Sequence, residues 1–120
     1  MLSLSASSRI WLCTLPADMR KSFDGLCGLV RQWLQGDPLS GDVFVFRNRS
    51  GDRVKILTWE GDGLVIWYKR LEAGTFRFPA PADDKNQQTI RAADLLMLLE
   101  GVELESVKRR PRYQKPTATA

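Results

Sequence analysis

The spacing of apolar residues changes along the first third of the chain, and the change predicts a strand followed by a helix. Residues 9–14 are rich in β-formers and predict a short strand, which Pro16 interrupts. Beyond it, apolar positions recur every three or four residues, which is the spacing of one helix face. Asp18 is suited to cap this helix and Gly36 to end it. The predicted stripe consists of Phe23, Leu26, Cys27, Val30, Trp33 and Leu34.

The middle of the chain predicts three antiparallel strands joined by tight turns. Val43–Arg47, Arg53–Trp59 and Leu64–Arg70 are rich in β-branched and aromatic residues. The segments between them combine Gly with Asp or Asn, which is a strong hairpin signal. We therefore expect a β-meander with turns at residues 48–52 and 60–63.

The last third predicts little regular structure except one helix. Thr75–Phe78 predicts a short edge strand, and residues 80–88 predict a loop. Thr89 is suited to cap a last, leucine-rich helix that ends at Gly101. Beyond this helix the chain becomes basic and polar and is punctuated by proline, a composition typical of disorder.

These elements predict an α+β fold class in two layers. An antiparallel β-meander packs against one long N-terminal helix, with a short C-terminal helix and a basic disordered tail. The 120 residues suit one domain, which we expect over residues 1–107, with the tail over residues 108–120.

Strand register assigns the meander's side chains to two faces, because successive side chains of a strand alternate. We expect Arg47 to pair with Arg53 and Trp59 with Leu64. One face is then nearly all apolar and forms the core under the first helix: Phe44, Phe46, Val54, Ile56, Thr58, Val65 and Trp67. The other is mixed: Val43, Val45, Arg47, Arg53, Lys55, Leu57, Trp59, Leu64, Ile66, Tyr68 and Arg70.

The mixed face supports two interpretations. Three arginines, Arg47, Arg53 and Arg70, gather at one end of it, and like charges repel unless an anion compensates. Cations that contact phosphates beside rings that stack on bases would suit single-stranded nucleic acid. Alternatively, the arginines pair with acids such as Asp52 and Glu72, and their stems cover apolar surface.

Charge is unevenly distributed along the chain. The net charge is +4, from 18 basic and 14 acidic residues. Five of the basic residues lie in residues 106–120, which hold no acid, so 13 remain against 14 acids in the rest. A basic tail on a near-neutral domain is suited to contacting phosphates, and it is equally compatible with a solubilising end.

The composition argues against an enzyme. The chain has no histidine, which removes the commonest general base and metal ligand. The carboxylates, among them Asp18, Asp24, Asp83, Asp84 and Asp94, show no convergent spacing, and capping, turns and solvation explain them. We expect no cofactor and no metal, and Cys13 and Cys27 to be small buried hydrophobes.

The N-terminus and the apolar runs indicate the compartment. Met1–Ser8 has no Lys or Arg and so lacks the basic start of a secretory signal. No apolar run approaches the roughly 18 residues that a membrane span needs. We therefore expect a cytoplasmic protein.

Several motifs stand in a characteristic order along the chain: Asp18–Leu26, Pro38–Arg49, Gly51–Leu57, Trp59–Leu64, Lys69–Glu72, Gly74–Phe76 and Leu98–Val102. Together they resemble one bacterial family, the TnpB, or second-open-reading-frame-like, accessory proteins of insertion sequence family sixty-six. The resemblance covers residues 8–104 and leaves out the tail beyond Ser106.

The resemblance implies a non-catalytic protein needed for transposition, because the family's transposase is a separate, larger protein. The expected partners are DNA at the element ends, the transposase and a co-accessory protein. The first hypothesis is DNA binding, in which Trp59 and Tyr68 stack or pack and a set of cations contacts the phosphates. These cations are Arg47, Arg49, Arg53, Lys55, Lys69, Arg70, Lys108, Arg109, Arg110 and Arg112. The alternative is an adaptor that docks on the transposase or co-accessory protein through Val43, Leu57, Trp59, Leu64 and Ile66.

Overall fold

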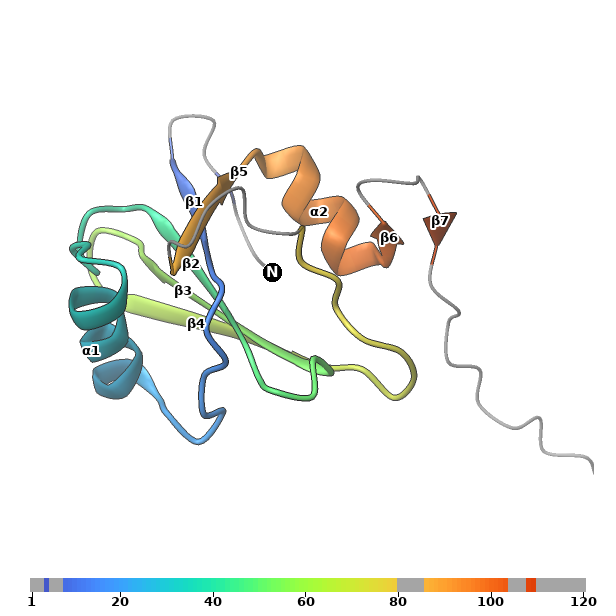
Figure 1. The fold of residues 1–120 in the computed structure, drawn as a ribbon. Coiled ribbons are helices and arrows are strands. Elements are labelled where there is room, and N and C mark those ends of the chain that lie inside the picture. The colour runs from blue at the N-terminus through green and yellow to red at the C-terminus, as the bar shows by residue number, and fades with distance from the viewer. Residues whose placement is uncertain (1–3, 5–7, 80–85, 104–107, 110–120) are drawn as a thin grey trace, which may run out of the picture.

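A five-stranded mixed sheet with a helix against each face forms the body of the protein (Figure 1). The computed structural model describes residue 4 and residues 8–79, 86–103 and 108–109. In chain order the elements are β1 (Ile10–Cys13), α1 (Phe23–Trp33), β2 (Val43–Arg47), β3 (Arg53–Trp59), β4 (Leu64–Arg70), β5 (Gln87–Ile90), α2 (Ala92–Glu100), β6 (Val102–Glu103) and β7 (Lys108–Arg109).

The strand order in the sheet is β4-β3-β2-β1-β5. Strands β2, β3 and β4 are antiparallel neighbours, so the predicted meander is confirmed. Strand β1 adds to it in parallel beside β2, and β5 closes the other edge antiparallel to β1. A parallel neighbour requires a crossover, and the segment that contains α1 provides it.

The predicted long N-terminal helix is wrong, since the helix α1 has 11 residues and lies within this crossover. Asp18 does not cap it. Instead Asp18 closes a separate turn, in which its carbonyl accepts a hydrogen bond from the Lys21 amide at 3.1 Å and its carboxylate accepts one from the Arg20 amide at 2.9 Å. Because these local bonds hold residues 18–21 outside the helix, α1 begins only at Phe23.

The core has two parts, one on each face of the sheet, so the predicted two-layer arrangement is also wrong. On one face, Leu26, Leu29 and Val30 of α1 pack against Phe44, Phe46 and Leu57. On the other, residues of α2 pack against Val43, Val45, Val54, Ile56, Ile10 and Leu12; the α2 residues are Leu95, Leu98 and Leu99. The sheet is buried on both sides and therefore forms the middle of three layers.

The predicted register is right for β3 with β4 and wrong for β2 with β3. Trp59 pairs with Leu64, as expected, but Arg47 pairs with Val54 and not with Arg53. Asn48 takes the place opposite Arg53, because its amide donates to the Arg53 carbonyl and its side chain accepts from the Arg53 amide. This shift of one residue puts Phe44 and Phe46 on the same face as Leu57, and moves Val54 and Ile56 to the face that α2 covers.

Other local predictions also change. Thr89 belongs to β5 and does not cap α2, whose N-cap residue is Arg91. Residues 75–78 form no strand, although the Phe76 amide donates to the Gly51 carbonyl at 2.8 Å and the Phe76 ring is fully buried. Both cysteines are buried free thiols, as expected.

The predicted disordered tail is only partly described. Its first two residues, Lys108 and Arg109, form β7 and pair with β6. Residues 110–120 lie outside the described residues.

Candidate nucleic-acid interface

The turn between β2 and β3 is held rigid by its own side chains. The Asn48 side-chain amide donates to the Asp52 carboxylate at 2.7 Å and to the Ser50 hydroxyl at 3.1 Å, and Ser50 donates to the same carboxylate at 2.9 Å. These hydrogen bonds, that of Asn48 foremost, lower the pKa of Asp52 below its ordinary value. Gly51 has a φ of +79°, a left-handed conformation that suits glycine.

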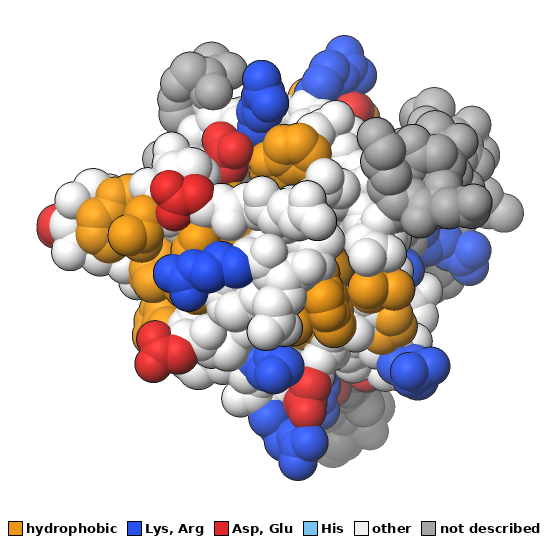
Figure 2. Space-filling view, turned by 60° about the vertical axis from the view of Figure 1, so that its left-hand side comes forward, with side chains coloured by type: hydrophobic (Ala, Val, Ile, Leu, Met, Phe, Trp, Pro, Cys, Tyr) orange, Lys and Arg blue, Asp and Glu red, His pale blue; other side chains and the backbone are white. Residues whose placement is uncertain are grey.

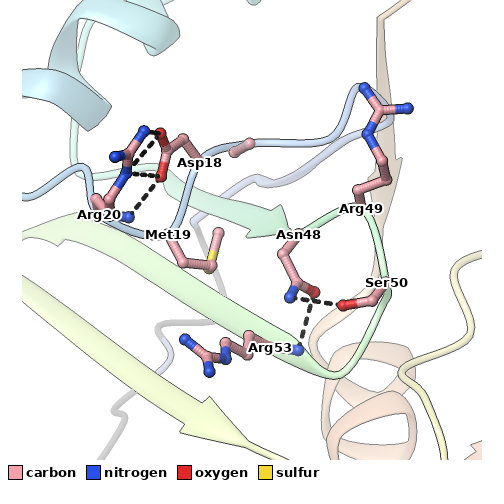
Figure 3. Close-up of a pocket in the computed structure, with 8 residues that line it drawn as sticks. Asp18, Met19, Arg20, Asn48, Arg49, Ser50 and Arg53 are labelled. Carbon is pink, nitrogen blue, oxygen red and sulfur yellow. Dashed lines mark hydrogen bonds and ion pairs between the residues drawn. The ribbon is translucent and has the colours of Figure 1, made fainter.

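Arg49 extends from this turn into solvent. Its side chain is exposed and forms no hydrogen bond or ion pair with another described residue. Two surface hollows lie on the two sides of the turn, and Arg49 and Ser50 line both of them. Arg49 and Arg53 leave the turn in different directions, so their charges face different parts of this surface (Figure 3).

One hollow, which we call the Arg20 hollow, has a volume of about 530 Å³ and lies between the turn and the loop after β1. Arg20 and Asp18 form a two-pronged ion pair there, with Nη2 of Arg20 2.7 Å from Oδ2 of Asp18 (Figure 3). Hydrogen bonds from Arg20 lower the pKa of Asp18 to about 2. The pair is fully exposed, so it contributes little to folding. The lining residues are Ala17, Asp18, Met19, Arg20, Asn48, Arg49, Ser50 and Arg53.

The other hollow, which we call the Arg47 hollow, has a volume of about 390 Å³. The half-buried guanidinium of Arg47 donates from Nη1 to the Phe76 carbonyl at 2.9 Å and stacks 4.2 Å from the ring centroid of Phe78. Burial lowers the pKa of Arg47, and no carboxylate within the described residues pairs with it. The lining residues are Arg47, Arg49, Ser50, Gly51, Thr75, Phe76, Arg77 and Phe78.

The predicted cluster of three arginines on one sheet face is wrong. Arg53 and Arg70 stand directly opposite each other on the face that α1 covers, but Arg47 lies on the other face because of the register shift. Arg70 pairs with Glu72 at 3.0 Å, as the alternative interpretation proposed for that residue. On the side of the molecule in Figure 2, basic side chains are interspersed with acidic ones and form no continuous patch.

Lys55 and Tyr68 interact with each other. Lys55 is only 8% exposed, although its side chain is charged. Its Nζ donates to the Lys21 carbonyl at 2.7 Å and lies 4.7 Å from the centroid of the Tyr68 ring. The Tyr68 hydroxyl accepts a hydrogen bond from Arg53 at 3.3 Å. One face of the Tyr68 ring is therefore occupied by a cation, and Lys55 is turned inward, away from any phosphate.

The remaining predicted residues are dispersed. Trp59 is half-buried opposite Leu64, at the other end of β3 from Arg53, so it forms no joint platform with Tyr68. Lys69 is exposed on the face that Arg47 shares. Arg110 and Arg112 lie outside the described residues, as do the side chains of Lys108 and Arg109.

Sequence reasoning missed several residues of these hollows, among them Arg20, Arg77 and Phe78 and the hydroxyl residues Ser50 and Thr75. The alternation of Phe76, Arg77 and Phe78 is a usable signal, because one buried ring fixes where its neighbours emerge. The sequence pattern alone predicts an edge strand over residues 75–78, and an edge strand gives no reason to place these residues beside the β2–β3 turn.

The apolar surface predicted for an adaptor is largely covered. Val43 and Leu57 are buried on opposite faces of the sheet, and Leu64 and Ile66 pack in the cluster beneath α1. The apolar side chains that do reach solvent include Leu96 and Met97 of α2, which are 52% and 37% exposed.

The described part of the chain contains neither a metal-binding cluster nor a membrane-spanning helix. It contains no group of three or more Cys, Asp or Glu side chains placed to bind a metal ion. Within the same residues, neither helix is long and apolar enough to cross a membrane.

Comparison with known proteins gives one family and two relatives. A sequence model described as IS66 Orf2 like protein matches residues 8–109. The uncharacterized protein y4jC of Sinorhizobium fredii is 36% identical over 120 residues, which cover 100% of both chains. The uncharacterized protein y4hO of the same organism is 37% identical over 103 residues, or 86% of this chain and 88% of the relative. No solved structure matches the chain significantly.

Proposed function

Because this chain belongs to the family of IS66 Orf2-like proteins, we propose that it is a non-catalytic accessory factor that binds the element's DNA during transposition. The family supports a role in the transposition of an insertion sequence. The mode of action is argued from the geometry around the β2–β3 turn, and we assign the protein to the cytoplasm, where the element's DNA lies.

The observation that carries the proposal is the position of Arg49 between two arginine-lined hollows. Arg53 lines one hollow and Arg47 the other, so cations lie on both sides of a rigid turn. The nearest acids are already engaged, Asp18 with Arg20 and Asp52 within the turn. This surface therefore attracts anions, and the regularly spaced phosphates of DNA supply them at high density.

The ring contacts favour double-stranded over single-stranded DNA. Single-strand binders stack successive bases on exposed aromatic faces. Here Lys55 occupies one face of Tyr68, Arg47 occupies one face of Phe78, and Trp59 is half-buried at the far end of β3. Tyr68, which is 47% exposed, therefore offers a single ring face and not the row of rings on which successive bases stack, so the charge of this surface suits the backbone of a duplex.

The test is the affinity of the full chain for a duplex of the element's ends at several salt concentrations. We expect affinity to fall steeply with salt, and Arg49→Ala to reduce the slope of log affinity against log salt by about 1. Arg31→Ala, at an exposed arginine in the last turn of α1, removes the same charge away from the turn and serves as the control. Salt-independent binding, or equal effects of the two variants, contradicts the proposal.

A second candidate function is an adaptor that docks on the transposase. The specific observation in its favour is the exposure of Leu96 and Met97 on α2. Single exposed apolar side chains are common on protein surfaces, but neighbouring ones such as these can form the centre of a protein–protein interface. A pull-down with purified transposase in the absence of DNA would support this function if binding is lost in Leu96→Asp and kept in Arg49→Ala.

A further inference from the structure

Arg47 is a half-buried cation with which no carboxylate of the described residues forms an ion pair. Charged groups that leave water are normally paired, because desolvation of an unpaired charge is costly. The guanidinium is half-buried, and its one hydrogen bond with the rest of the described chain goes to a neutral acceptor, the Phe76 carbonyl. Arginine stays protonated in proteins, so its charge persists in this site.

The geometry around Arg47 leaves donors available to a ligand. A guanidinium carries five N–H donors in a fixed fork, and only Nη1 donates within the described residues. The stack on Phe78 fixes the plane of the fork at a distance of 4.2 Å. A fork held in this way is pre-organised for a planar pair of oxygens, as in a phosphate or carboxylate.

The other walls of the Arg47 hollow suit an anion. Arg49 contributes a second cation, and Ser50 and Thr75 contribute hydroxyls that can donate. No acidic side chain is among the described residues that line it. The volume of about 390 Å³ far exceeds the ~30 Å³ that one water molecule occupies in the liquid. A tetrahedral oxyanion with part of its hydration shell therefore fits.

We propose that the Arg47 hollow binds a single phosphate group, which Arg47 holds from below and Arg49 from the solvent side. This inference rests on the proposed function in that it assigns the phosphate to the DNA backbone. A free phosphate ion offers the same chemistry, and the test distinguishes the two sources.

The first arm of the test uses inorganic phosphate without DNA. Backbone amide signals are followed by NMR while phosphate replaces chloride at constant ionic strength. We expect saturable shifts centred on Gly51 and Thr75, abolished in Arg47→Met, weakened in Arg49→Ala and unchanged in Arg31→Ala. The absence of saturable shifts in the wild type, or equal shifts in Arg47→Met, overturns the proposal.

Two checks separate binding from folding. Arg47→Met keeps an unbranched apolar side chain and removes the partly desolvated charge that stacks on Phe78, so we expect its thermal midpoint to stay within a few degrees of that of the wild type. Arg49→Ala alters only an exposed side chain, and its weaker phosphate shifts test the hollow even if Arg47→Met does not fold. Unweakened shifts in Arg49→Ala would contradict the assigned role of that residue.

The second arm measures affinity for the duplex used above. If the phosphate belongs to the DNA backbone, Arg47→Met weakens binding at least tenfold, and Arg47→Lys restores only part of the loss because it lacks the fork. If the wild type shows the phosphate-induced shifts but Arg47→Met binds DNA with unchanged affinity, the assignment to DNA is overturned and the hollow is a site for the free ion. Absence of all DNA binding defeats the proposed function, whereas absence of the shifts alone defeats only this inference.

Discussion

Asn48 and Arg53 close the β2–β3 turn through two hydrogen bonds. The Asn48 amide donates to the Arg53 carbonyl at 3.1 Å, and the Arg53 amide donates to Oδ1 of Asn48 at 3.0 Å. The side-chain oxygen of Asn48 thereby accepts a hydrogen bond in the way a backbone carbonyl would. Its side-chain amide also donates hydrogen bonds to Ser50 and Asp52. One residue thus determines both the register of β2 with β3 and the shape of the turn that carries Arg49.

Replacing Asn48 is expected to loosen this turn. Asn48→Ala removes three hydrogen bonds, one of them to the Asp52 carboxylate, and should lower the free energy of unfolding by about 1–3 kcal/mol. Chemical denaturation measures the change, with Asn86→Ala, at an exposed residue outside the turn, as the control. Equal stability of the two variants would show that the side-chain bonds do not hold the turn.

Gly51 is expected to be the least replaceable residue of the turn. An alanine there must adopt a φ of +79°, and its Cβ would lie 3.4 Å from the Cβ of Thr75. The left-handed backbone alone costs about 1–2 kcal/mol in a residue with a Cβ. Gly63→Ala in the β3–β4 turn is the matched control, because nothing lies within 4 Å of its added Cβ. Thermal unfolding should show a lower midpoint for Gly51→Ala only.

Lys55 provides a test of which cations contact DNA. Because its ammonium is turned inward toward the Lys21 carbonyl, Lys55→Met should leave affinity for duplex DNA unchanged. Its free energy of unfolding should change by no more than about 1 kcal/mol, since an apolar side chain of similar length replaces a desolvated charge. Fluorescence anisotropy with labelled DNA checks the affinity. A loss as large as that of Arg49→Ala would mean that the Lys55 side chain turns outward to bind DNA.

The Asp18–Arg20 pair should determine how Asp18 titrates. The pKa of Asp18 is lowered from 3.8 to about 2 in the folded protein, so the stabilisation from this pair is present above about pH 4. It is lost as the pH falls through about 2, where the carboxyl becomes protonated. NMR titration of the carboxyl should give a pKa near 2 in the wild type and a higher one, closer to 3.8, in Arg20→Ala. Arg31→Ala should leave the curve of Asp18 in place.

The sequence pattern was sufficient to locate the strands of the meander and both turns. Alternating β-formers and Gly-Asp signals act locally, so residues 43–70 were assigned correctly. It was not sufficient to place β1 in the sheet, because β1 meets β2 in parallel through contacts about 33 residues apart. The parallel pairing in turn requires a crossover, and α1 lies within it.

At the candidate site, the side chain of Asn48 determines a strand register that differs from the one the hydrophobic pattern predicts. Pairing Arg47 with Arg53 gives one face that is nearly all apolar, which is the usual sign of a correct register. The sheet instead has a helix on each side, so both faces bury apolar residues and hydrophobicity alone does not select the register. The hydrogen bonds of Asn48 select the register, and they depend on the folded turn, so the hydrophobic pattern does not indicate them.

The interior position of β1 has a consequence for the order of folding during synthesis. Residues 10–13 leave the ribosome before both of their neighbours in the sheet, residues 43–45 and 87–90. The meander can form as soon as residue 70 has emerged, because its pairings are local. Strand β1 has both neighbours only after residue 90 has been translated, so the strand that is synthesised first is the last to be enclosed in the sheet.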